Sequence, residues 1–165
     1  MRTELASLLP LARLLGATFM SWKLLSLACN CPYPAMVVLS ESMSPAFQRG
    51  DIIFLSNWED QVEVGDIPVV WFTGNLLPMV HRAVATLYDD GGKQLILTKG
   101  DNNDETDEIM YPPGRTHVFR EEIIGLVRGF VPYLGCITIA VREVPWLKPV
   151  LAVGLFMLSA FSAIA

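Results

Sequence analysis

Charged residues are scarce in this sequence, and basic ones are the scarcer kind. Asp, Glu, Lys and Arg make up 18% of the 165 residues, against about 25% in an ordinary soluble domain. The 12 basic and 17 acidic side chains give a net charge of −5. This balance argues against nucleic acid as a partner, because a nucleic-acid-binding surface is basic. The hydrophobic fraction of 52% excludes an intrinsically disordered chain.

Cysteine and histidine are also scarce, which limits the chemistry available. Three cysteines are an odd number, so the sequence indicates no disulfide framework. The two histidines are His81 and His117. His81 falls in a strand-like run and is a candidate general base, whereas His117 falls in a polar loop and is expected to be solvated. No Asn-x-Ser/Thr glycosylation site is present.

The apolar residues concentrate at the two ends of the chain. Residues 6–29 are interrupted only by Arg13 and Lys23, and a bilayer core about 30 Å thick needs about 20 mostly apolar residues in a helix. This predicts an N-terminal transmembrane anchor, with a cleavable signal peptide as the alternative. The length favours the anchor, because the apolar part of a signal peptide is about 7–15 residues. Residues 150–165 carry no charge and predict a C-terminal apolar helix that is buried, interfacial or spanning.

Residues 31–149 predict an antiparallel β-domain, folded as a barrel or a coiled sheet. Short apolar runs are separated by turn signals, and helical periodicity is absent. The turn at residues 89–92 joins two of the runs into a hairpin, and residues 106–120 are expected to be a long loop. The predicted strands are residues 35–39, 51–55, 69–72, 80–87, 94–98, and 123–127 with 129–131.

The chain therefore divides into an anchor (residues 1–30), a β-domain (31–149) and a C-terminal apolar segment (150–165). Residues 1–30 carry a net charge of +2, and residues 31–149, with nine basic and sixteen acidic side chains, carry −7. Because positively charged flanks of a membrane span stay in the cytosol, the β-domain is expected outside the cytosol.

Three polar islands in the β-domain could carry chemistry. Ser40 and Ser42 follow the first strand, His81 lies in a later strand, and Asp101 and Asp107 lie in an acidic segment. A serine hydroxyl needs a base to take its proton, and a neutral imidazole needs a carboxylate to fix its tautomer. Together these residues could form a Ser-His-Asp triad. Taken separately, each is more often a turn, core or surface residue.

The acidic segment also raises the alternative of a calcium site. Five carboxylates fall within residues 101–108. An EF-hand loop that began at Asp101 would need Gly at its sixth position and Glu at its twelfth. The sequence has Thr106 and Pro112 there, so a solvated acidic turn is favoured over a metal site, and no cofactor is predicted.

Five segments, in this order and spacing, resemble the boxes of type I signal peptidases. They most resemble the catalytic subunit of the endoplasmic-reticulum signal peptidase complex, the Sec11 type. The resemblance covers roughly residues 10–149. The segments are LSESMSPAFQRGD (residues 39–51), VGDIPVVWF (64–72), VHR (80–82), LTKGDNN (97–103) and GFVPYLG (129–135).

The resemblance implies a role for each candidate residue. Ser42 is the nucleophile and His81 the general base, at the position where the bacterial enzymes have a lysine. Asp107 is the preferred triad carboxylate and Asp101 a supporting residue, although the two could exchange roles. Ser40 matches a hydroxyl that helps the Ser42 backbone N–H to stabilise the oxyanion, where charge develops in the transition state.

The implied activity is a membrane-bound serine endopeptidase that removes N-terminal signal peptides from proteins translocated into the endoplasmic reticulum. Its partners would be signal-peptide-bearing preproteins, other subunits of the complex and membrane lipid. The chain would be a single-pass type II protein of that membrane, with the catalytic domain in the lumen. The substrate would lie as an extended strand beside residues 35–40, with small side chains at the first and third positions before the cut.

Two residues depart from the family pattern Ser-Gly-Ser-Met-Glu-Pro. This chain has Glu41 in place of the glycine and Ser44 in place of the glutamate. If the turn needs the conformational freedom of glycine, Glu41 would strain it. Because of this departure, an alternative prediction is that the chain is a non-catalytic membrane scaffold subunit with the same fold.

Overall fold

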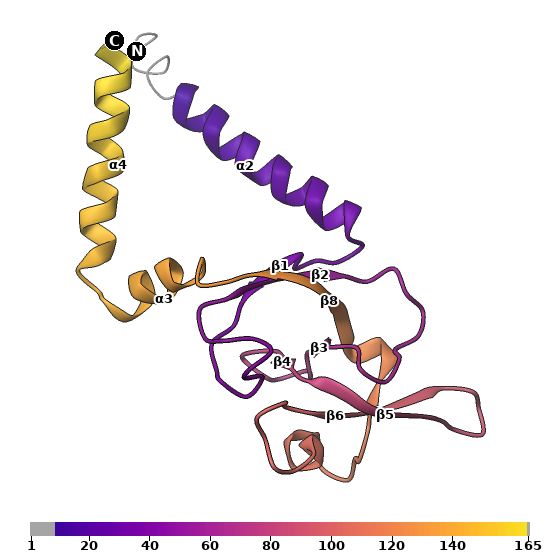
Figure 1. Ribbon diagram of the computed structural model, residues 1–165. Helices are drawn as coiled ribbons and strands as arrows, with labels where there is room; N and C mark the ends of the chain where they lie inside the picture. The colour runs from indigo at the N-terminus through magenta and orange to yellow at the C-terminus, as the bar shows by residue number, and fades with distance from the viewer. Residues whose placement is uncertain (1–8, 165) are drawn as a thin grey trace.

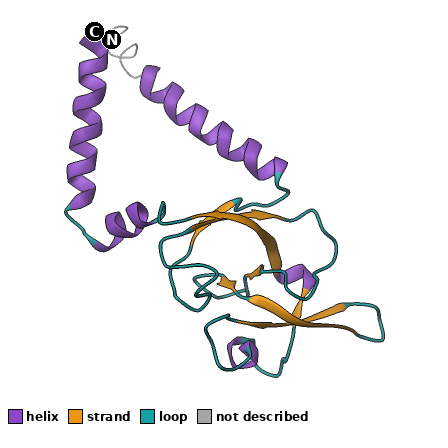
Figure 2. Ribbon diagram, in the orientation of Figure 1, coloured by secondary structure: helices purple, strands orange, loops and turns teal. Residues whose placement is uncertain are grey.

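The computed structural model describes residues 9–164, which form a β-rich body with helices outside it. Figure 1 shows α2 (Leu9–Ala28) and α4 (Leu147–Ile164) extending from the same side of this body. Between the last strand and α4 lies the short helix α3 (Cys136–Glu143). In Figure 2 the strands gather in the body and these three helices lie at its periphery.

The body contains one five-stranded and one three-stranded sheet, and every strand pair is antiparallel. The larger sheet has the order β1 (Ala35–Val37), β2 (Ile52–Ser56), β8 (Ile123–Val131), β3 (Pro68–Val70), β4 (Met79–Val80). The smaller sheet has the order β5 (Arg82–Tyr88), β6 (Gln94–Lys99), β7 (Val118–Phe119). The first and last strands of the larger sheet, β1 and β4, are its edges.

The larger sheet is curled, and two register shifts help to curl it. The β2–β8 pairing shifts between Phe54 and Leu55, and the β3–β8 pairing shifts between Val69 and Val70. Such bulges bend a strand and increase its twist, and β8 is visibly bent in Figure 2. The mainly antiparallel β fold predicted from the sequence is confirmed.

Period-two alternation sends one face of each strand into the core. In β6 the residues Gln94, Ile96 and Thr98 are buried while those between them are partly exposed, as expected where successive side chains point to opposite faces. Ile96 packs in one buried apolar cluster and Ile53 of β2 in a second. Each buried side chain of this size contributes roughly 1.5–3 kcal/mol to stability. Thr98 and Gln94 are polar residues within this core.

Three local expectations differ from the structure. The predicted strand at residues 80–87 is broken at His81, which lies between β4 and β5. The predicted loop at residues 106–120 contains the short helix η1 (Asp107–Met110) and the strand β7, and the short helix η2 (Arg120–Glu122) begins at its last residue. The expectation that residues 31–149 form a β-domain without helical periodicity is wrong near its C-terminal end, where Cys136–Glu143 form α3.

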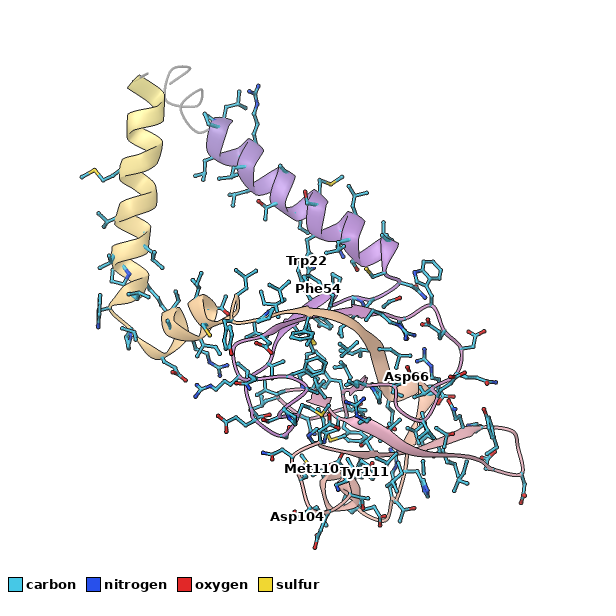
Figure 3. The ribbon with its side chains drawn as sticks, viewed as in Figure 1. Trp22, Phe54, Asp66, Asp104, Met110 and Tyr111 are labelled. Atoms are coloured by element: carbon cyan, nitrogen blue, oxygen red, sulfur yellow. The ribbon has the colours of Figure 1, made fainter. Side chains whose placement is uncertain are left out.

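The predicted anchor at residues 6–29 is helical from Leu9 to Ala28, and its first residues lie outside the described part of the chain. None of the residues of α2 is buried, and large apolar side chains such as Leu14 and Phe19 are exposed along it. Trp22 is labelled on this helix in Figure 3. Within residues 9–164, no helix combines the length and the apolarity that crossing a membrane requires.

Candidate active site

Ser42 lies in the loop between β1 and β2, and this loop is fixed by its own backbone and by two buried side chains. The amide of Ser44 donates to the Glu41 carbonyl (3.0 Å), and the amide of Phe47 donates to the Met43 carbonyl (3.0 Å). Met43 and Phe47 are both buried in the core. Ser42 therefore lies between anchored residues and is itself only partly buried.

The loop after β6 holds the same segment from the other side. The Asn102 amide donates to the Ser42 carbonyl (2.8 Å), and the Asn102 side chain donates to the Glu41 carbonyl (3.2 Å). A Cβ atom on Gly100 would lie only 2.7 Å from the Ser42 carbonyl oxygen. The close approach of the two loops therefore requires glycine at position 100.

His81 connects the Ser42 hydroxyl to a buried carboxylate. Its Nε2 lies 2.9 Å from Ser42 Oγ, and its Nδ1 lies 2.7 Å from Asp107 Oδ2. His81 is 4% exposed and Asp107 is 1% exposed. A carboxylate can only accept, so Nδ1 of the neutral ring carries the proton and Nε2 accepts from Ser42. This arrangement can make the serine nucleophilic, because the proton acceptor is in place and correctly oriented.

Asp101 pairs with Arg82 and not with His81. It receives two hydrogen bonds from Arg82, Nε to Oδ1 at 2.8 Å and Nη2 to Oδ2 at 2.6 Å. Arg82 also donates to the Gly65 carbonyl (2.9 Å), and the bond to Asp101 is the largest cause of the raised pKa of Arg82. Of the two carboxylates proposed from the sequence, the structure brings Asp107 to His81 and pairs Asp101 with the arginine that follows His81.

Ser40 lies beside the nucleophile, with its Oγ 3.1 Å from Ser42 Oγ. Because the Ser42 hydroxyl donates to His81, the Ser40 hydroxyl is the donor in this contact. Ser40 Oγ is therefore within hydrogen-bonding distance of the Ser42 Oγ atom.

The expected strain at Glu41 is absent. Among residues 9–164, the non-glycine residues with positive φ are Asn30 and Tyr133, so the backbone at Glu41 does not need the conformational freedom of glycine. Its carbonyl is held by Ser44 and Asn102, and its side chain is exposed. The departure from the family pattern therefore leaves the geometry of the loop intact.

The acidic segment does not gather its carboxylates at one point. Asp101 is paired with Arg82 and Asp107 with His81, while Asp104 lies at the outer edge of the molecule (Figure 3). Within the described residues, no group of three or more His, Cys, Asp or Glu side chains could hold a metal ion.

Two further side chains complete the site, and neither was predicted from the sequence. Thr98 donates from Oγ1 to Asp107 Oδ2 (2.7 Å), and the Tyr111 hydroxyl lies 2.9 Å from Thr98 Oγ1. Thr98 stands two positions before Gly100 in the LTKGDNN segment, which could have drawn attention to it. Tyr111 lies in the segment expected to be a loop, and no pattern in the sequence distinguishes it.

A groove with a volume of about 1010 Å³ leads to Ser42 and His81. Its lining includes β1 and the residues that follow it, residues 77–81 and side chains of α3. The lining therefore includes both edges of the curled sheet, β1 and β4. Because edge strands have unpaired backbone groups, an extended peptide can add to them as a further strand.

Comparison with known proteins adds a second line of evidence. No protein-family model matches the sequence. A protein of Sclerotinia sclerotiorum named signal peptidase complex catalytic subunit sec11 is 45% identical, over 91% of this chain and 88% of its own length. A protein of Metarhizium robertsii with the same name is 44% identical over the same shares. A protein of Zygosaccharomyces rouxii, also with this name, is 43% identical over 90% of this chain and 89% of its own.

Proposed function

The chain belongs to the Sec11 family of signal peptidase complex catalytic subunits, and on this basis we propose the chemistry of its site. It is a serine endopeptidase that cleaves N-terminal signal peptides from proteins translocated into the endoplasmic reticulum. Ser42 is the nucleophile, His81 the general base and Asp107 the carboxylate that orients the base. The observation that carries the proposal is the chain of two hydrogen bonds from Ser42 through His81 to Asp107.

The proposed reaction proceeds through an acyl-enzyme. Ser42 Oγ attacks the carbonyl carbon of the scissile bond while its proton moves to His81 Nε2. Asp107 stabilises the imidazolium that forms. When the tetrahedral intermediate collapses, His81 gives the proton to the nitrogen of the leaving mature protein. His81 then takes a proton from a water molecule as the water oxygen attacks the acyl carbon, and it gives this proton to Ser42 Oγ when the bond to Oγ breaks and the signal peptide leaves as a carboxylic acid.

Two groups are available for the developing oxyanion, the Ser42 backbone N–H and the Ser40 hydroxyl. One donor in such a site is worth about 10²–10³-fold in kcat. Ser40 is supported in this role by the 3.1 Å between the two serine Oγ atoms. Asp101 supports the site indirectly, since its pairing with Arg82 holds the start of β5, next to His81.

The substrate lies in the groove as an extended strand between the edges β1 and β4. The lining is largely apolar, including Val37, Met43 and Phe47. The family resemblance implies small side chains at the first and third positions before the cut, and these two side chains face the same wall because alternate residues of a strand point to one side. The partners are therefore signal-peptide-bearing preproteins, together with the other subunits of the complex.

Membrane attachment forms a separate part of the proposal. Residues 1–30 anchor the chain as a single type II span of the endoplasmic-reticulum membrane, residues 31–149 form the lumenal peptidase domain, and residues 150–165 form the C-terminal apolar segment. Exposed apolar side chains on α2 and α4, such as Phe19 and Leu151, support contact with lipid or with other subunits. Both helices extend from the same side of the body (Figure 1), so both can reach one membrane.

This attachment predicts that the chain stays in microsomal membranes after extraction with alkaline carbonate. Protease added outside intact microsomes should leave residues 31–149 undigested, because these residues lie in the lumen. Adding detergent should make them sensitive. Release of the chain by carbonate, or digestion of the domain without detergent, would contradict the proposed topology.

The two carboxylates give a test of the site. Asp107→Asn is expected to lower kcat for preprotein cleavage about 10⁴-fold, because an amide in place of the carboxylate leaves the imidazole in the wrong tautomer. Asp101→Asn is expected to cost at most about tenfold, because a partly exposed ion pair is worth roughly 1 kcal/mol.

Both variants should be assayed in the assembled complex, with equal amounts of the subunit confirmed by immunoblot. The two substitutions remove one charge each from the same acidic segment, so each serves as the control for the other. The reverse ranking would mean that Asp101 is the triad carboxylate.

A further inference from the structure

Thr98 is the penultimate residue of β6, is fully buried at 0% exposure, and makes three hydrogen bonds that involve a side chain. Oγ1 lies 2.7 Å from Asp107 Oδ2 and 2.9 Å from the Tyr111 hydroxyl, and the Thr98 amide nitrogen lies 2.9 Å from the same hydroxyl. The oxygen of Asp107 that Thr98 contacts is also the one that accepts from His81 Nδ1.

The direction of each hydrogen bond in this cluster follows from the number of protons available. The Thr98 amide can only donate, so it donates to the Tyr111 oxygen. The Thr98 hydroxyl has one proton, and the Asp107 carboxylate must receive it. The remaining contact is therefore made by the Tyr111 hydroxyl, which donates to Thr98 Oγ1. Burial raises the pKa of Tyr111, so the hydroxyl keeps the proton that this arrangement needs.

The same contacts hold both ends of the turn that carries Asp107. Asp107 is the first residue of η1, and Tyr111 directly follows the last, with its amide bonded to the Glu108 carbonyl (3.3 Å). Met110 and Tyr111 are labelled on this turn in Figure 3. The ring of Tyr111 packs edge-on against Phe72, with centroids 5.9 Å apart. The hydroxyl of Tyr111 is thereby fixed by the core.

We propose that Thr98 is a positioning residue for the triad, and that Tyr111 acts through it by orienting the Thr98 hydroxyl. Two donors on one oxygen, from Thr98 and His81, keep the Asp107 carboxylate from rotating away from the imidazole. A displacement of about 1 Å in such a site can cost about 10²-fold in rate. This inference rests on the proposed peptidase function and adds two residues that do not touch the substrate.

The first test replaces Thr98 with valine, which has nearly the same shape and no hydroxyl. Thr98→Val is expected to lower kcat for preprotein cleavage about 10- to 100-fold with KM unchanged, because the groove is not altered. Thr98→Ser keeps the hydroxyl and is expected to recover most of that rate. Thr86→Val is the matched control, since Thr86 lies in the adjacent strand and makes no side-chain hydrogen bond to the described residues.

The second test asks whether Tyr111 acts through Thr98. Tyr111→Phe keeps the ring against Phe72 and removes the hydroxyl, so a smaller loss in kcat is expected. The double variant Thr98→Val/Tyr111→Phe should be no slower than Thr98→Val alone, because the Thr98 hydroxyl that Tyr111 orients is already gone. Losses that multiply in the double variant would overturn the role given to Tyr111.

The outcomes separate this inference from the proposed function. All variants are measured in the assembled complex, beside Ser42→Ala and with Tm recorded. If Thr98→Val cleaves at the wild-type rate while Ser42→Ala does not cleave, the positioning role is wrong and the peptidase function stands. If Thr98→Ser loses as much activity as Thr98→Val and Tm falls equally in both, Thr98 is only a core residue and the inference is overturned. If Ser42→Ala cleaves normally, the proposed function itself fails.

Discussion

Ser42→Ala is expected to reduce preprotein cleavage by more than ~10⁴-fold, which is no detectable processing in a cell-based assay. Alanine removes the atom that the geometry places to attack the substrate, Oγ at 2.9 Å from His81 Nε2. Ser40 is not expected to take its place, because its Oγ lies beside Ser42 and donates to it, and it makes no hydrogen bond to a base among the described residues. The measurement is complementation of a strain depleted of its own subunit, scored by the accumulation of an uncleaved signal-bearing precursor.

The substitution should leave the complex assembled. Ser42 is half-exposed and its carbonyl, which bonds to Asn102, is unchanged by the loss of Oγ. Ser44→Ala is a suitable control, since this serine lies in the same loop and is bonded through its backbone amide. Normal processing by Ser42→Ala would contradict the peptidase function and favour the hypothesis that this chain is a non-catalytic scaffold subunit.

The features of the fold that depend on local pattern could be predicted from the sequence. The alternation of apolar and polar residues, together with turn residues, predicted the segments that form β2, β6 and β8. It also predicted the hairpin between β5 and β6. The order of strands in the larger sheet could not be read in this way, because it depends on which distant segments pair. The bulges between Phe54 and Leu55 and between Val69 and Val70 likewise arise from pairing with β8.

The helix α3 shows how tertiary contacts override a local preference. Its β-branched residues Ile137, Thr138 and Ile139 favour a strand. A Cβ on Gly135, just before the helix, would lie 2.6 Å from a side-chain atom of Val37 and 2.8 Å from the Gly50 carbonyl. The chain passes this point in close contact with β1, and Thr138 Oγ1 then donates to the Gly135 carbonyl (2.6 Å). The Thr138 bond is local to the first turn of the helix, whereas the contact of Gly135 with Val37 and Gly50 is tertiary and is not visible in the local sequence.

The sequence could identify most residues of the candidate site. It could not predict which of them contact one another. Ser42, His81 and the acidic segment could be selected by type and by family resemblance. The choice between Asp101 and Asp107 depends on where each side chain points, which is decided by Arg82 taking one and His81 the other. Thr98 escaped notice because a buried threonine in a strand looks like any β-branched core residue until its hydroxyl partner is known.

His81→Ala is expected to be as damaging as Ser42→Ala, because residues of a triad act as a unit and removing the base leaves the serine hydroxyl inert. The other histidine, His117, provides the control. It bonds to the neighbouring Thr116 (2.8 Å) and belongs to no part of the groove lining. His117→Ala should process the precursor at the wild-type rate.

His81→Lys distinguishes this site from the bacterial type, in which lysine is the base. A lysine base works only when its surroundings favour the neutral amine, by burial away from other charges. Here the introduced ammonium would lie near Asp107, whose carboxylate is 1% exposed and 2.7 Å from the present ring. An opposite charge at this distance favours the protonated form, so His81→Lys is expected to stay inactive at neutral pH. The double variant His81→Lys/Asp107→Asn lacks the negative charge of Asp107. Its lysine can lose its proton more easily, so this variant is expected to show some activity. Activity in His81→Lys alone would mean that Asp107 does not govern the base, and would contradict the role assigned to this carboxylate.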